Sequence, residues 1–192
     1  TSAAFSPNGK LLATASYDNK LRIWGTHTGQ LVASLEGHTD EIRAVSFSPN
    51  GELVASSSRD ETVRVWSTSS WKLVRSHDER GGYEVVFSPD GTTLASASRW
   101  GVRVWKLKAA SALVTLGKRP AESVAFSPDG KTLMSAPWNG NDIHVWDAQS
   151  AKLLHTLASG SPRAASFSND GQHIVSIVTE PDHPSEIRVW SA

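Results

Sequence analysis

The feature of this chain that most limits its fold is a five-residue turn motif that returns about every 40 residues. The motif reads Phe-Ser-(Pro/Asn)-(Asn/Asp)-Gly, and its copies begin at Phe5, Phe47, Phe87, Phe126 and Phe167. The intervals between the copies are 42, 40, 39 and 41 residues. A tryptophan ends a short apolar segment 18 to 23 residues after each start, namely Trp24, Trp66, Trp105, Trp146 and Trp190. A period near 40 residues is typical of repeat folds, which usually present a surface rather than a reaction centre.

The second repeat shows what each unit should form. Alternation of apolar and polar residues and short apolar runs predict four strands, at 42–47, 53–57, 62–66 and 71–74. Tight turns join them, because Pro49 fixes one backbone angle and Asn50-Gly51 accepts positive φ. Four short antiparallel strands cannot bury both faces alone, so neighbouring sheets must stack, and radial stacking produces a β-propeller.

At these residues the chain resembles the WD-repeat family of β-propellers, over essentially its whole length. The matching residues in the second repeat are Gly37-His38, the turn 47–51, the segment 56–60 and Trp66. The Trp-Asp pair itself occurs only at Trp146-Asp147. The resemblance implies an all-β propeller of four-stranded antiparallel blades, with about five blades present as part of a larger, seven-bladed ring. We expect one domain over 1–192, with repeats at about 1–41, 42–82, 83–121, 122–162 and 163–192.

The resemblance also implies a hydrogen-bonded network inside each blade, made of a histidine, a hydroxyl, an aspartate and the tryptophan. The hydroxyl is in register in all five repeats, as Thr14, Ser56, Ser96, Ser135 and Ser176. The aspartate is present as Asp18 and Asp60, and its position is taken by Trp100, Asn139 and Glu180 in the later repeats. The histidine position holds His38, Asp78 (beside His77), Gly117 and Ala158 in repeats two to five.

The full set therefore occurs only in repeat two, as His38, Ser56, Asp60 and Trp66. A serine, a histidine and an aspartate suggest a catalytic triad, but residues that face a tryptophan inside a blade leave no room for a substrate carbonyl. We interpret the set as a structural network that pairs buried polar groups.

The strand count predicts an incomplete ring. The chain opens inside a first strand at 1–5 and stops just after a third strand at 187–190, so only four fourth strands are expected. Seven blades at this period would need about 280 residues. Three interpretations follow: a part of a longer propeller, a closed five-bladed ring with a three-stranded last blade, or a ring completed by another chain. The first residue is Thr1 and not methionine, so we expect a processed product or an excised piece.

The amino-acid composition disfavours several classes of function for this chain. Lysine plus arginine equals aspartate plus glutamate at 19 each, so no overall field would attract nucleic acid or an anionic membrane. The chain has no cysteine, which excludes disulfides and thiolate metal sites and is compatible with a reducing, cytoplasmic location. We expect no catalytic residues, no cofactor and no metal ion.

The family resemblance implies that partners bind on the rim where second-to-third and fourth-to-first loops meet. Aligning the other repeats on Arg43 gives one exposed first-strand position in each blade, and the adjoining loops add aromatic and charged residues. Such residues are favoured at interface hot spots. The candidate partner-binding residues are Tyr17, Glu41, Arg43, Arg59, Tyr83, Trp100, Glu122, Trp138 and Arg163. Trp100 and Trp138 have an alternative interpretation, in which both pack under neighbouring loops where the aspartate is missing.

We therefore expect a non-catalytic scaffold that presents a propeller face to a protein or peptide. The alternative is the sensor or autoinhibitory region of a larger signalling ATPase or kinase, since WD-repeat arrays with such uniform turns look like those attached to these proteins in bacteria and fungi. An enzyme using the central channel would need convergent acids, a histidine cluster or a metal set, which the pattern does not supply. Unpaired blade edges are a further route to association.

Overall fold

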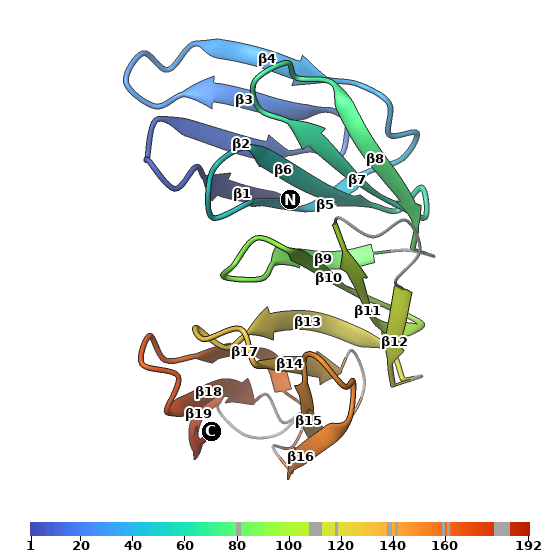
Figure 1. Cartoon of the computed structure of the whole chain (residues 1–192), viewed down its shortest axis with the longest axis vertical. Coiled ribbons are helices and arrows are strands. Elements are labelled where there is room, and N and C mark those ends of the chain that lie inside the picture. Colours follow the sequence, from blue (N-terminus) through green and yellow to red (C-terminus); the bar gives the residue numbers. More distant parts are fainter. Residues whose placement is uncertain are drawn as a thin grey trace.

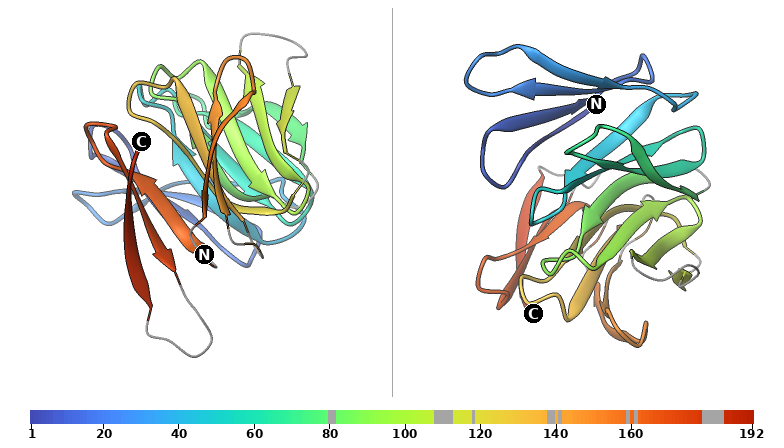
Figure 2. Two further views of the ribbon diagram at one scale, coloured as in Figure 1. Left: turned by 90° about the horizontal axis from the view of Figure 1, so that it is seen from below. Right: turned by 45° about the horizontal axis from the view of Figure 1, so that its top comes forward.

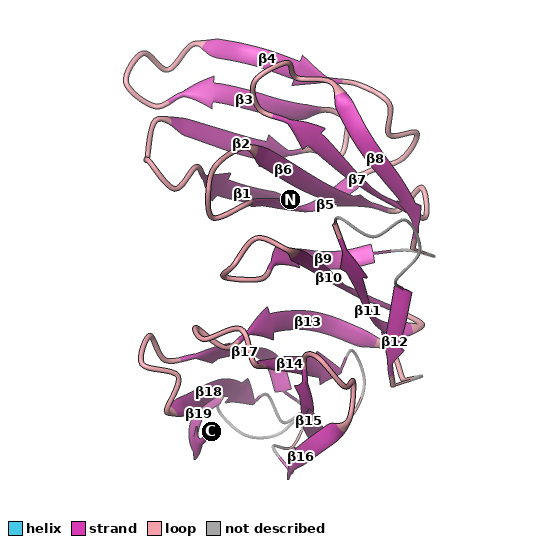
Figure 3. Ribbon diagram, in the orientation of Figure 1, coloured by secondary structure: helices cyan, strands magenta, loops and turns pink. Residues whose placement is uncertain are grey.

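The computed structural model describes residues 1–79, 82–107, 113–117, 119–137, 140, 142–158, 160, 162–178 and 185–192, without the side chains of 113, 163 and 164. Every regular element in these ranges is a β-strand (Figure 3). Within them, no helix is both long enough and apolar enough to cross a lipid bilayer.

The strands are short and evenly spaced. In chain order they are β1 (Ser2–Phe5), β2 (Leu11–Ala15), β3 (Leu21–Gly25), β4 (Leu31–Leu35), β5 (Ile42–Phe47), β6 (Leu53–Ser58), β7 (Thr62–Ser67), β8 (Leu73–Asp78), β9 (Gly82–Phe87), β10 (Thr93–Ser98), β11 (Gly101–Lys106), β12 (Leu113–Leu116), β13 (Ala121–Phe126), β14 (Thr132–Pro137), β15 (Asp142–Asp147), β16 (Leu153–Ala158), β17 (Pro162–Phe167), β18 (His173–Val178) and β19 (Glu186–Ser191).

Consecutive strands pair antiparallel into five separate sheets, which we call blades one to five. Blades one to four contain four strands each, β1–β4, β5–β8, β9–β12 and β13–β16, and blade five contains three, β17–β19. The blades follow one another along an arc (Figures 1 and 2), and the first strands of successive blades lie side by side. The predicted propeller architecture is confirmed, including the four fourth strands in five repeats.

Strand positions in the second repeat agree with the prediction to within one residue except at the fourth strand. The predicted strand 71–74 is wrong at both ends, because β8 begins at Leu73 and continues to Asp78. Trp71 has a left-handed backbone (φ 56°), and its N–H donates to the Ser67 carbonyl at 2.9 Å, so this residue closes the preceding turn. Its side chain packs against the core between blades one and two.

The repeated turn between first and second strands is held by its own side chains. In repeat two the Ser48 hydroxyl donates to Asn50 Oδ1 at 2.7 Å, and the Leu53 N–H donates back to Ser48 Oγ at 2.9 Å. Gly51 has a φ of 72°, a conformation that glycine adopts without steric cost. A side chain there would lie 3.6 Å from Pro7 of the previous turn, so the turns also pack against one another from blade to blade.

The core lies between the blades. One side of each sheet presents branched aliphatic residues, such as Val63 and Val65 of blade two, and these pack with Phe87 and Trp105 of blade three. The outermost faces have no such cover in the structure. Phe5 of blade one is 66 % exposed, while the equivalent Phe47 is 8 % exposed.

At the other end of the arc, Ile187 of blade five is 72 % exposed, while the equivalent Val63 is fully buried. The two end faces therefore carry the same complementary residue types that pack together at each internal junction.

Candidate functional site

The predicted first-strand positions are the extra residues of β-bulges. Pairing between first and second strands shifts register at Arg43, Tyr83, Glu122 and 163, in β5, β9, β13 and β17. A bulge leaves one residue unpaired and redirects its side chain. The bulge thus explains why this one position departs from the strict alternation of the first strand in blades two to five.

Four of the nine predicted residues meet on the rim between blades two and three, and we call them the rim cluster: Glu41, Arg43, Arg59 and Tyr83. The Arg43 guanidinium donates to Glu41 Oε1 from Nε at 2.8 Å, with Nη2 at 2.6 Å. The carbon between its nitrogens lies 4.8 Å from the centre of the Tyr83 ring, a cation–π distance. Arg59 Nη1 lies 4.0 Å from the same Glu41 oxygen, and its side chain is 61 % exposed.

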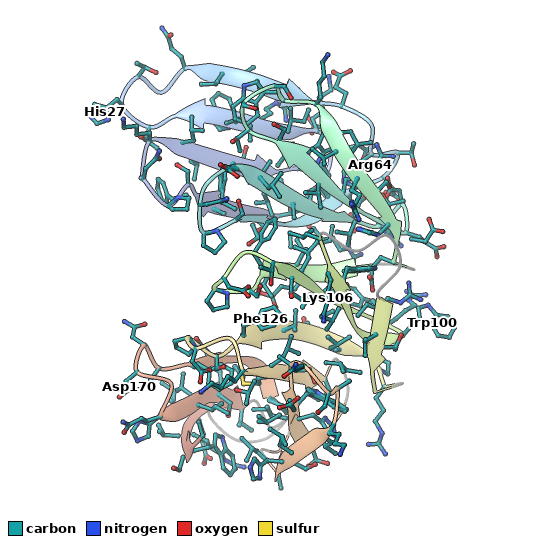
Figure 4. All side chains as sticks on the ribbon, in the orientation of Figure 1. His27, Arg64, Trp100, Lys106, Phe126 and Asp170 are labelled. Atoms are coloured by element: carbon teal, nitrogen blue, oxygen red, sulfur yellow. The ribbon has the colours of Figure 1, made fainter. Side chains whose placement is uncertain are left out.

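The remaining predicted residues are more scattered. Tyr17 and Trp100 are exposed in the β2–β3 and β10–β11 turns, and Figure 4 shows Trp100 pointing away from the body of the chain. About half of the Trp100 side chain, 53 %, is exposed to solvent. Glu122 is only half-buried, and its Oε2 has no hydrogen-bond partner within the described part of the chain. Trp138 and the side chain of Arg163 lie outside the described residues.

Blade two contains the complete polar network. His38 Nδ1 lies 2.8 Å from Asp60 Oδ2, and His38 Nε2 lies 2.8 Å from Ser56 Oγ. The Trp66 indole N–H donates to Ser56 Oγ at 3.0 Å. Asp60 also accepts hydrogen bonds from the Thr39 N–H at 3.0 Å and from the Thr62 hydroxyl at 2.7 Å.

Electrostatics assign one protonation state to this network. Burial lowers the pKa of His38, which outweighs the opposing effect of Asp60. Burial acts to raise the pKa of Asp60, but hydrogen bonds from Thr62, the Thr39 N–H and His38 hold it below its ordinary value. A neutral imidazole therefore donates from Nδ1 to an ionised carboxylate and accepts the Ser56 proton at Nε2. Ser56 is completely buried and already bonded, so its hydroxyl is not placed to attack a substrate.

The tryptophan–hydroxyl bond recurs in three other blades without the histidine. Trp24, Trp146 and Trp190 donate to Thr14, Ser135 and Ser176 at 2.8, 3.0 and 3.4 Å. In blade one, Asp18 pairs with Arg22 through two hydrogen bonds. Among the side chains that the structure describes, no three histidines or carboxylates gather as metal ligands would.

Blade three contains a buried acid that the sequence pattern did not reveal. The pattern assigned the histidine position to Asp78, but β8 continues through Asp78, and the next residue, Glu79, is fully buried beside Ser57 and Gly82. Burial raises the pKa of Glu79 to about 7, an effect that Ser96, Arg103 and Ser98 only partly oppose. Both carboxyl oxygens, like the hydroxyls of Ser57 and Ser96, lack a hydrogen-bond partner among the described residues.

His77 lies beside the position that the sequence aligns with the histidine of repeat two. Its ring stacks on Trp105 at 5.1 Å between centres and 22° between planes. No signal in the sequence separated Glu79 from the exposed Asp78, because the end of β8 decides which of the two acids enters the blade.

The chain is similar to known proteins both in sequence and in fold. The model of the family described as the IFT122 first β-propeller matches residues 1–190. A probable serine/threonine-protein kinase, PkwA of Thermomonospora curvata, is 49 % identical over 41 residues, which are 21 % of this chain and 6 % of that protein. An uncharacterized WD repeat-containing protein, alr2800 of Nostoc sp., is 46 % identical over 44 residues, which are 23 % of this chain and 4 % of that protein.

Two solved structures have the same fold at low identity. The Cps50 (Swd1) β-propeller domain of Myceliophteria thermophila superposes with a TM-score of 0.84 at 17 % identity, over 93 % of this chain and 62 % of that one. The hydrazine synthase of Kuenenia stuttgartiensis superposes with a TM-score of 0.83 at 16 % identity, over 99 % of this chain and 62 % of that one. The chain thus spans less than two thirds of each of these proteins.

Proposed function

This chain belongs to the WD-repeat β-propellers, in the family of the IFT122 first β-propeller, and on that premise we propose that it is a non-catalytic scaffold whose rim binds a protein or peptide. Propellers of this type commonly serve as protein-interaction scaffolds. The proposal adds which surface of this chain makes the contact: the rim cluster, together with Tyr17 and Trp100. A cytoplasmic location is part of the proposal, supported by the lack of cysteine in the sequence.

The observation that carries the proposal is the arginine–tyrosine pair across blades two and three. Glu41 holds Arg43 in place over the Tyr83 ring, so the pair is ordered before any partner arrives. Arginine and tyrosine are enriched at interface hot spots, and a side chain already held loses less entropy on binding. Trp100, 53 % exposed, adds a large aromatic surface at the same ends of the strands.

The lack of catalytic machinery in blade two also supports the proposal. The side chains of Ser56, His38 and Asp60 there are already hydrogen-bonded to one another, and Ser56 also accepts a hydrogen bond from Trp66. Their side chains are shielded from solvent, with His38 1 % and Asp60 3 % exposed. These residues stabilise the blade from which the rim cluster projects.

A quantitative pull-down with the parent-length protein tests the proposal. We expect Arg43→Ala and Trp100→Ala each to reduce partner recovery about fivefold or more, the effect of losing a hot spot of about 1 kcal/mol. Lys131→Ala is the control, because Lys131 lies in a turn at the opposite ends of the strands and is 81 % exposed. Full recovery with both rim variants would exclude this surface.

A second candidate function is supported by the match to the probable kinase. The matched 41 residues are only 6 % of that protein, so the similarity would also fit a propeller region that senses or restrains a kinase domain. Sequencing the surrounding reading frame tests this candidate. A kinase or nucleotide-binding ATPase domain in the same frame would support it, and a frame with propeller repeats alone would exclude it.

A further inference from the structure

Two copies of the repeated turn contain an asparagine followed by glycine, Asn8-Gly9 in blade one and Asn50-Gly51 in blade two. Glycine has no side chain to hinder the approach of its backbone nitrogen to the side chain of the preceding residue. Asparagine before glycine is therefore the pair in which deamidation meets least steric hindrance. The later copies of the turn have the product of that reaction at the same position, as Asp90, Asp129 and Asp170.

Deamidation needs only water as a co-reactant. The backbone nitrogen of the glycine attacks the side-chain carbonyl carbon of the asparagine and forms a succinimide ring. The side-chain nitrogen leaves as ammonia, together with the proton of the glycine N–H. Water then opens the ring at one carbonyl to give aspartate, or at the other to give isoaspartate, in which the main chain passes through the β-carbon.

The folded turn engages both reacting groups in hydrogen bonds. The Gly9 N–H donates to the Ser6 carbonyl at 2.8 Å. Asn8 Oδ1 accepts from the Ser6 hydroxyl at 2.8 Å and from the Lys10 N–H at 3.0 Å. The turn at Asn50 has the same three bonds. The reaction therefore requires the turn to open locally, and its rate depends on the free energy of that opening.

The two turns differ at the nitrogen that leaves. Asn50 Nδ2 donates to the Glu52 carboxylate at 2.8 Å. Two residues after Asn8 the chain has Lys10, whose side chain cannot accept, and Asn8 Nδ2 has no acceptor within hydrogen-bond distance in the part of the chain that the structure describes. One hydrogen bond changes an equilibrium by a factor of about five. The turn at Asn50 should resist opening by that factor more than the turn at Asn8.

Charge acts in the same direction as this hydrogen bond. The attack on the carbonyl carbon places negative charge on the amide oxygen. The Glu52 carboxylate, which is bonded to the Asn50 amide, opposes that charge, whereas the cationic Lys10 beside Asn8 favours it. Both differences make Asn8 the faster of the two sites.

The turn accepts the aspartate product without rearrangement. Asp90 Oδ1 accepts from the Ser88 hydroxyl and from the Thr92 N–H, the same two kinds of bond that Asn8 accepts. These bonds hold the pKa of Asp90 below its ordinary value. An aspartate in this turn is therefore ionised at neutral pH and receives charge-assisted bonds, which are stronger than those to an amide. Isoaspartate adds a carbon to the main chain and so disturbs Gly9, whose φ is 69°.

We propose that Asn8 is a deamidation site, at which water converts the asparagine to aspartate, and that Glu52 protects Asn50 from the same reaction. The product gives blade one the aspartate that the turns of blades three to five already contain. It changes the formal net charge of the chain from zero to minus one. The modified turn lies at the ends of the strands opposite the rim cluster, so the site is independent of the proposed scaffold function.

Incubation of the full chain in mildly alkaline buffer, followed by trypsin digestion and mass spectrometry, tests the proposal. The two sites fall in different tryptic peptides, residues 1–10 and 44–59, and each peptide gains the mass difference between an amide and an acid on conversion. We expect Asn8 to convert about fivefold faster than Asn50, or more. Equal rates, or a faster Asn50, would overturn the proposal.

Two reciprocal variants test the cause of the difference. Lys10→Glu gives the first turn the carboxylate that the second turn has, and it should slow conversion of Asn8 about fivefold. Glu52→Lys removes that carboxylate from the second turn and should speed conversion of Asn50 by a similar factor. Both positions are exposed, so neither change disturbs the core. Unchanged rates in the two variants would overturn the protective role of Glu52.

The same incubation in urea separates the effect of the fold from that of the neighbouring residues. The unfolded chain lacks the bonds of both turns, so the two sites should convert at similar rates, each faster than in the folded protein. A difference in urea as large as in the folded protein would overturn the structural explanation. Asn8→Asp should also unfold at the same urea concentration as the parent or at a higher one, and a lower midpoint would contradict the accommodation of the product.

Discussion

Replacing Glu79 with glutamine tests the buried acid of blade three. Burial raises its carboxyl pKa from 4.5 to about 7, while the unfolded chain ionises near the lower value. Between these two pH values the folded state holds a proton that the unfolded state has released. The free energy of unfolding therefore falls as the pH rises through this window.

The magnitude follows from the size of the shift. One pKa unit corresponds to about 1.4 kcal/mol, so the stabilisation is complete below about pH 4.5 and about 3 kcal/mol of it is lost above about pH 7. Glutamine has nearly the same shape and cannot ionise. We expect the Glu79→Gln variant to match the parent near the lower pH and to be about 3 kcal/mol more stable near pH 8. For a chain of this size, that corresponds to roughly 6–12 °C in Tm.

Urea unfolding followed by tryptophan fluorescence, at several pH values from about 4.5 to 8, provides the measurement. The difference between variant and parent isolates Glu79 from His38 and His77, whose pKa values are also shifted, in the downward direction, by burial. Glu61→Gln, an exposed change, is the control. A parent-to-variant difference that stays constant with pH would refute the reasoning.

Three further predictions concern the blade network, the turns and the end faces. Asp60→Ala leaves His38 without its acceptor and should lower the free energy of unfolding by about 1–3 kcal/mol. The control Asp18→Ala removes an exposed carboxylate and should cost less. Equal melting temperatures for Asp60→Ala and the parent would count against the network. Gly51→Ala would make only an ordinary van der Waals contact, with Pro7 at 3.6 Å, but it keeps a φ of 72°. The variant should therefore cost about 1–2 kcal/mol from backbone strain, and a neutral result in urea unfolding would contradict this. Replacing Ile187 and Val189 with lysine should reduce concentration-dependent association in sedimentation velocity, because both are exposed on the open face of blade five; unchanged association would show that other surfaces are responsible.

Most of the fold could be predicted from the repeat pattern, because the pattern is local in the sequence. A turn with glycine at positive φ, a strand ending in tryptophan and a hydroxyl at a set distance all depend on residues close together in the chain. The hydroxyls opposite Arg22, Arg64, Arg103, His144 and Arg188 occupy the same register in every blade, as their spacing predicted. The fourth strand was less predictable, because the conformation of Trp71 shifted its start.

The candidate site was predictable in its positions but not in its contacts. Spacing from Arg43 identified the bulge residue of blades two to five, yet a stacking of Arg43 on Tyr83 requires two blades to meet at a particular distance. Similarly, Glu79 and Asp78 are adjacent acids in the sequence, and only the end of β8 places Glu79 in the interior.

The amino-acid sequence alone thus determined the family, the number of sheets present and the residues of the blade-two network, because a repeated short-range pattern states the same information five times. Only the tertiary structure decided which polar groups among the described residues are buried without partners and which aromatic rings stack. These properties depend on the packing of one blade against the next, and the shape of that junction is set jointly by residues about 40 positions apart.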